Sequence, residues 1–153
     1  MHPIVEYLAT DHDRLDRLLT EATATPGQID PVPFSAFRRG LLRHIGIEEK
    51  ILFSAARKVK GEPVREFDRL RADHARLTAL LVPTPTAAIV QELRDILVPH
   101  NEIEERGEGT YEECVALIGD EANEILEKIR NQPEPPVRPH YDERKPILLQ
   151  RER

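Results

Sequence analysis

Cysteine, tryptophan and long apolar runs are scarce or missing in this sequence. The only cysteine is Cys114, so the chain forms no intramolecular disulfide and no cysteine-rich zinc site. No apolar run approaches the roughly eighteen residues that a membrane-spanning helix needs. We therefore predict no transmembrane segment, and we expect stability to come from packing or from a metal site without thiolates.

Aromatic residues and a positive charge surplus are also lacking. The chain has four Phe, three Tyr and no Trp, so it offers few platforms on which bases or sugars would stack. The net charge is −6, and the 22 Lys and Arg residues are scattered among 28 Asp and Glu residues. This pattern argues against nucleic acid and membranes as partners. The first residues lack the basic and apolar segments of a secretory signal, so we expect a cytoplasmic location.

The length and the residue pattern indicate one all-α domain. The 153 residues suit a single domain. Segments rich in Leu, Ala, Glu and Arg are separated by Pro and Gly, with almost no alternation of apolar and polar residues. We predict helices over about 3–24, 34–59, 63–81, 86–106 and 111–131. The first four suit an antiparallel up-down-up-down four-helix bundle, with an extra C-terminal helical segment completing a domain of residues 1–131.

The C-terminal tail differs from the rest of the chain. Residues 132–153 contain five prolines and the apolar patch Ile147–Leu149, a composition typical of extended chain. Such a tail either packs along the bundle, joins a second copy in a homodimer, or is loosely held.

Each predicted bundle helix places polar residues within its apolar stripe. At helical spacing, the stripe of the first helix runs through Ile4, Leu8, His12, Leu15, Leu19 and Ala22. The stripe of the second is Phe37, Leu41, His44, Glu48, Ile51, Ala55 and Val59. Over the four helices the polar members of the stripes are His12, His44, Glu48, His74, His100 and Glu104.

These six residues together predict a metal site. One histidine on an apolar face is more often a hydrogen-bonded core residue than a ligand. Two buried carboxylates with four imidazoles, however, would be costly without compensating positive charge. Two cations at the centre would supply that charge. Imidazole with carboxylate suits iron, zinc, manganese or nickel rather than calcium or magnesium.

The sequence repeats itself around the predicted ligands. The stretch 11–15, DHDRL, resembles 73–77, DHARL, and 44–49, HIGIEE, resembles 100–105, HNEIEE. Two similar helical hairpins would then meet about a pseudo-twofold axis, with two metals bridged by Glu48 and Glu104. Each metal would take two histidines, and the sequence leaves open which histidines pair. Asp11, Asp13 and Asp73 flank ligands and are candidates for orienting the imidazoles.

This arrangement resembles the hemerythrin-like, or HHE cation-binding, family over about residues 1–130. The resemblance rests on a histidine in the first and third helices and His-x-x-x-Glu in the second and fourth. It implies a four-helix bundle around a non-haem di-iron centre with an oxo or hydroxo bridge, and zinc or manganese as possible substitutes. The implied ligands are the same six residues: His12, His44, Glu48, His74, His100 and Glu104.

Two departures from the oxygen-carrying members bear on function. Thr78 stands where those members have a further histidine, and Glu104 stands where they have Asp. With four core histidines, we expect both metals to keep open positions, unless a carboxylate such as Glu49, Glu102 or Glu105 becomes an extra ligand. Open positions favour reactive chemistry with dioxygen, peroxide or nitric oxide over reversible carriage.

Several functions are compatible with such a centre, and we assign no catalytic residue. The favoured prediction is a protein that binds dioxygen or a related diatomic ligand, in oxygen or nitric oxide response or in iron handling. The alternatives are a di-iron redox enzyme (an oxidase, a peroxide-consuming activity, or repair of nitric oxide damage or iron centres) and a metal-stabilised regulatory module. Tyr111, seven residues after Glu104, would face the ligands on an unbroken helix and donate a hydrogen bond to a bound oxygen species. Gly107 and Gly109 interrupt that helix.

Overall fold

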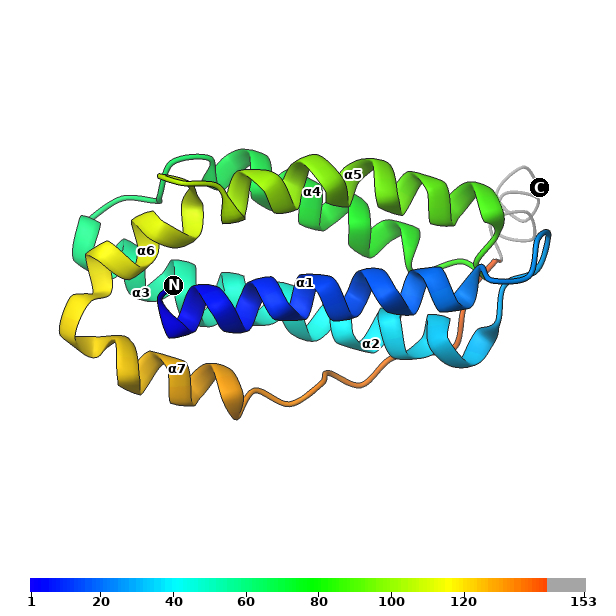
Figure 1. Ribbon diagram of the computed structural model, residues 1–153, viewed down its shortest axis with the longest axis horizontal. Coiled ribbons are helices and arrows are strands. Elements are labelled where there is room, and N and C mark those ends of the chain that lie inside the picture. Colours follow the sequence, from blue (N-terminus) through cyan, green and yellow to red (C-terminus); the bar gives the residue numbers. More distant parts are fainter. Residues whose placement is uncertain (143–153) are drawn as a thin grey trace, which may run out of the picture.

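A computed structural model describes residues 1–142, which form helices and connecting segments without a strand (Figure 1). The tail beyond them, with the apolar patch Ile147–Leu149, lies outside the described residues. No helix in the described range is long and apolar enough to cross a membrane. The elements are α1 (Pro3–Ala22), α2 (Pro31–Gly46), a π-helix η1 (Ile47–Leu52), α3 (Phe53–Lys60), α4 (Phe67–Leu80), α5 (Ala87–Glu105), α6 (Thr110–Ile118), a 3-10 helix η2 (Gly119–Glu121) and α7 (Ala122–Arg130).

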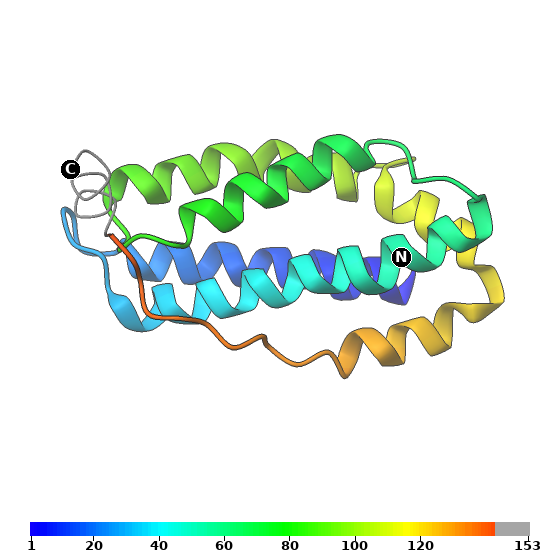
Figure 2. The ribbon, with the colours of Figure 1, turned by 180° about the vertical axis from the view of Figure 1, so that it is seen from behind.

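The architecture is the predicted antiparallel bundle. The hairpin of α1 and α2 lies beside the hairpin of α4 and α5, and α6 closes one end (Figures 1 and 2). The first two helices approach closely at Gly40, where a Cβ atom would lie 2.8 Å from the Arg14 guanidinium and 2.9 Å from Leu15. Capping follows the sequence signals: Asp30 and Thr86 accept hydrogen bonds from the backbone N–H of Val32 and Ile89.

The third predicted helix starts later than expected. Pro63 suited the first turn of a helix, but α4 begins at Phe67, directly after Glu66 in a left-handed conformation. The backbone N–H of Arg65 instead donates to Glu113 Oε1 of α6 at 3.1 Å. This tertiary contact holds the segment in a turn and overrides the local signal.

A π-helix shifts the core-facing stripe of the second predicted helix by one residue. In η1 the N–H of Phe53 bonds to the carbonyl of Glu48, five residues earlier, which inserts one residue into the turn. The sequence placed Ile51, Ala55 and Val59 in the stripe, whereas Val59 is exposed. Leu52 and Ala56, one position after Ile51 and Ala55, are buried instead, together with Phe53.

The last predicted helix, over 111–131, is two helices. Gly119 has a φ of +49°, which ends α6, and α7 then turns back along the outside of the bundle (Figure 1). From Gln132 the described part of the tail runs along α2 (Figure 2). Arg43 of α2 fixes this start, because its Nε donates to the Gln132 carbonyl at 2.6 Å and its Nη2 donates to the Tyr7 hydroxyl of α1 at 2.9 Å. Contact of the tail with a second copy of the chain stays a prediction.

Two apolar cores fill the bundle, one towards each end. The core at the α6 end includes Leu8, Leu52 and Ile129, and the core at the opposite end includes Leu19 and Phe37. Between the two cores lies a layer of buried polar side chains, which contains the predicted ligands.

Candidate metal centre

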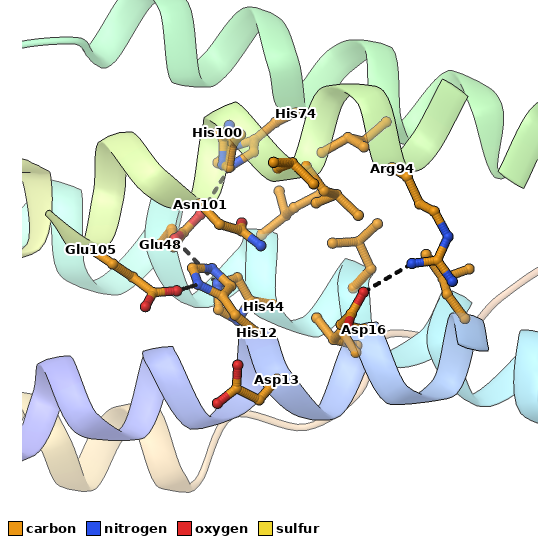
Figure 3. A pocket seen from close by; sticks show the side chains of 17 residues that line it. His12, Asp13, Asp16, His44, Glu48, His74, Arg94, His100, Asn101 and Glu105 are labelled. Carbon is orange, nitrogen blue, oxygen red and sulfur yellow. Dashed lines mark hydrogen bonds and ion pairs between the residues drawn. The ribbon is translucent and has the colours of Figure 1, made fainter. Parts of the chain in front are cut away.

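The six predicted ligands meet in this central layer. They are at most 6 % exposed, and both carboxylates are fully buried. The helices α1, α2, α4 and α5 each contribute one histidine, and Glu48 and Glu104 come from η1 and α5. Figure 3 shows the four histidines and Glu48 converging from both hairpins.

The ligand atoms form two groups. One consists of His12 and His44 with both carboxylates, and the other consists of His74 and His100 with the same carboxylates. Within each group the ligand atoms lie within 4.8 Å of one another. The histidine pairing that the sequence left open is therefore within each hairpin.

Each carboxylate spans the two groups. Glu48 places Oε2 3.2 Å from His44 Nε2 and Oε1 2.9 Å from His74 Nε2. Glu104 places Oε1 3.2 Å from His12 Nε2 and Oε2 3.2 Å from His100 Nε2. One oxygen at each group is the arrangement required of a bridging carboxylate.

A carboxylate holds the far nitrogen of every ligand histidine, and the two halves of the chain repeat this pattern. His44 Nδ1 donates to Asp11 at 2.8 Å. The equivalent bond in the second hairpin joins His100 Nδ1 and Asp73 at 3.0 Å. In the other direction, Glu49 accepts from His74 Nδ1 at 2.7 Å, and Glu105 accepts from His12 Nδ1. These bonds direct each Nε2 towards the centre of the bundle.

Asp11→Asn is expected to weaken metal binding by about 10–100-fold, the usual effect of removing a carboxylate that orients a ligand histidine. Competition with a chromophoric chelator measures this affinity. The matched control is Asp13→Asn, because Asp13 flanks His12 on the other side but is exposed and makes no hydrogen bond to a ligand histidine in the described residues. Equal affinity of the two variants would contradict a role for the Asp11–His44 bond.

The carboxylates also hold protons on the imidazoles of the metal-free centre. Burial disfavours the charged form, but the charge of Glu48 and the bond to Asp11 raise the pKa of His44 to about 10. At His100 burial again disfavours the charged form, but the hydrogen bond and the charge of Glu104 raise its pKa to about 9. Although burial favours the neutral acid, His44 holds the pKa of Glu48 well below its usual value. A cation entering this centre would therefore displace protons.

Some buried atoms of the centre lack partners, which fits a cation between them. His74 Nε2 and Glu48 Oε1 are close together without hydrogen-bond geometry, and neither has another partner in the described part of the chain. The same holds for Glu104 Oε2. Unpaired buried polar atoms are costly, and a cation at the centre of each group would satisfy them. The residues present thus fit a metal site.

Tyr111 reaches this centre although the helix before it is broken. Its ring is fully buried, and its hydroxyl lies within hydrogen-bonding distance of Glu104 and Glu48. Burial and the charges of these two carboxylates raise the pKa of Tyr111 well above its usual value. The helix is interrupted at Gly107 and Gly109 as expected, but Gly109 allows α6 to restart close to α5, because a Cβ there would lie 2.5 Å from the Ile103 carbonyl.

A cavity of about 320 Å³ opens onto the centre. All four histidines and Glu48 line it, whereas Tyr111 and Glu104 do not. Its other walls are mainly apolar, formed by Leu15, Leu19, Leu41, Ile45, Leu77, Leu97 and Val98. Polar contacts lie further out, where Arg94 pairs with Asp16 at 3.0 Å (Figure 3).

Several flanking residues differ from their predicted roles. Glu49 and Glu105 were candidates for extra ligands, but they accept from histidine Nδ1 atoms instead. Thr78 is exposed, so the position of the missing histidine does not face the centre. Asn101, which no sequence signal marked, lines the cavity and has an Oδ1 atom without a partner in the described residues.

The fold and the site together define the class of helical-bundle proteins with a buried histidine and carboxylate metal site. A family model described as Hemerythrin HHE cation binding domain matches residues 3–109, more than half of the chain. The chain therefore belongs to the hemerythrin HHE cation-binding domain family, as its motifs predicted. No curated protein and no solved structure matches it.

Proposed function

We propose that the chain holds two iron ions and binds dioxygen or a related diatomic ligand, such as nitric oxide, beside them. The observation that carries this proposal is the pair of carboxylates that each place one oxygen at both histidine groups. Four imidazoles and two carboxylates, without thiolates, are a donor set suited to iron. Manganese or zinc would fit the same donors and are outcomes of the test.

In this proposal His12 and His44 would hold one ion, His74 and His100 would hold the other, and Glu48 and Glu104 would each offer one oxygen to both. Iron supplies the redox chemistry and the open coordination positions at which a diatomic ligand binds. The carboxylates at the Nδ1 atoms keep the imidazoles oriented and increase their basicity. The Leu-rich walls of the cavity offer a small apolar ligand a largely apolar path to the histidines.

The experiment is iron loading followed by exposure of the reduced protein to air or nitric oxide. About two irons per chain by elemental analysis, together with an optical change that reverses on removal of the gas, support the proposal. A single ion, or zinc in preference to iron, would overturn the di-iron assignment. Irreversible oxidation would instead favour the alternative of a di-iron redox enzyme.

Leu97→Trp tests whether the ligand enters through the cavity. The side chain of Leu97 lines it, and an indole there would fill much of its volume. We expect the association rate of nitric oxide, measured by stopped flow, to fall by roughly tenfold or more, equivalent to about 1.4 kcal/mol in the barrier. The control is Val32→Trp on the exposed start of α2. An unchanged rate in both variants would show that the ligand enters elsewhere.

The size of the cavity favours one second candidate. A volume of about 320 Å³ has room for roughly ten waters at about 30 Å³ each, which is more than a diatomic ligand needs. An oxidase acting on a small organic substrate would use this space. Turnover of such a substrate by the iron-loaded protein, with consumption of dioxygen, would establish the enzyme.

A further inference from the structure

The hydroxyl oxygen of Tyr111 lies among the ligand atoms of one group only. Its Oη is 3.1 Å from His12 Nε2, 3.2 Å from His44 Nε2 and 3.0 Å from Glu104 Oε1, and it also contacts Glu48 Oε2. Both carboxylate oxygens face His12 and His44, since Glu48 Oε2 lies 3.2 Å from His44 Nε2 and Glu104 Oε1 lies 3.2 Å from His12 Nε2. The phenol oxygen therefore occupies the same small volume as the atoms that would surround a cation.

These separations are those of neighbouring ligands on one metal. Nitrogen and oxygen ligands lie about 2.1 Å from an ion of this kind. Two such ligands at a right angle are then separated by about 3.0 Å. The distances from Tyr111 Oη to both Nε2 atoms and to Glu104 agree with this spacing.

A hydrogen-bonding role explains only part of this environment. The phenol has a single proton, which goes to one carboxylate at a time, so the oxygen of the other carboxylate lies against the phenol oxygen without a hydrogen bond. The hydroxyl contacts both carboxylates directly, and Tyr111 is fully buried and does not line the cavity. Neither packing of the ring nor a hydrogen bond to one carboxylate requires the phenol oxygen to lie against all four ligand atoms.

We propose that Tyr111 is a further ligand of the ion held by His12 and His44, bound through its phenolate oxygen. The inference rests on the proposed two-metal centre. On binding, the O–H bond breaks, the proton is released to solvent, and the oxygen lone pair forms the bond to the metal, without change of oxidation state. Tyr111 follows the stretch matched by the family model, residues 3–109, so that match does not assign it this role.

The proposal makes the two ions unequal. The ion of His12 and His44 has five protein donors, including the tyrosine. The ion of His74 and His100 has four, the two histidines and the two shared carboxylates. Open positions for an external ligand then lie mainly at the second ion, on the cavity side.

Optical and resonance Raman spectroscopy of the ferric protein test this assignment. Iron(III) bound by a phenolate has a visible charge-transfer band, and excitation in that band enhances tyrosinate ring vibrations. We expect both signals in the wild type and the loss of both in Tyr111→Phe, with two-iron content and helical circular dichroism retained. The control is Tyr7→Phe, because Tyr7 contacts Arg43 rather than the ligands and should leave the signals unchanged.

Gallium(III) loading gives a readout that does not depend on iron chemistry. Formation of one tyrosinate per chain on loading, seen as an ultraviolet difference spectrum, is expected in the wild type and in Tyr7→Phe and not in Tyr111→Phe. A chain that binds two irons without the visible band and the tyrosinate vibrations overturns the ligand role and leaves the proposed function intact. A chain that binds neither iron nor gallium overturns both.

Discussion

Glu48→Gln is expected to lower the iron bound per chain from about two ions to below one. Both groups of ligand atoms contain Glu48, so both ions lose a donor and a negative charge. The change keeps the shape of the side chain, but it replaces one carboxylate oxygen by an NH₂ group that does not bind metal. Elemental analysis after loading and desalting measures the effect.

The matched control for this substitution is Glu102→Gln. Glu102 lies on α5 close in sequence to Glu104, but it is exposed and pairs only with Arg106 at 3.7 Å among the described residues. We expect it to keep the full metal content. If Glu48→Gln also keeps two ions per chain, neither group is built around the shared carboxylate and the bridging arrangement is wrong.

The fold was largely predictable because helical periodicity records burial directly. The stripe over 3–24, from Ile4 to Ala22, is buried as predicted. The stripe over 34–59 is correct only as far as Glu48. The π-turn there is closed by a backbone hydrogen bond from Phe53 to Glu48, and no residue in 47–52 signals the inserted position.

The candidate ligands were predictable because charged residues in an apolar stripe need an explanation. Their histidine pairing depends on which helices are neighbours, and a single sequence does not contain that information. The carboxylates at the Nδ1 atoms were only partly found. Asp11 and Asp73 were named because they flank ligands, whereas Glu49 and Glu105 were given a different role, since the direction of a side chain follows from packing.

Tyr111 shows most clearly what sequence spacing misses. Seven residues after Glu104 is a helical spacing, but the helix that would justify it ends at Glu105. The turn through Gly109 and the new helix α6 bring the ring back to the ligands by a different route. Spacing gave a correct neighbour for an incorrect reason, because proximity here depends on a tight turn rather than on a continuous helix.

Removal of the metal by a chelator is expected to lower the thermal unfolding midpoint by roughly 10 °C. A ligand that binds only the folded chain, at about a thousand times its dissociation constant, stabilises it by about 4 kcal/mol, and each kcal/mol corresponds to about 2–4 °C at this size. We expect the helices to persist without metal, because the buried carboxylates retain hydrogen bonds from the histidines and Tyr111. Circular dichroism melts before and after treatment with EDTA measure both quantities.

The Glu48→Gln chain separates this effect from any action of the chelator itself. With its metal binding already impaired, its midpoint should not change on treatment with EDTA. If the wild type loses its iron and melts at an unchanged temperature, the polar layer is satisfied by its own hydrogen bonds. The metal would then serve the reaction of the centre without stabilising the folded chain.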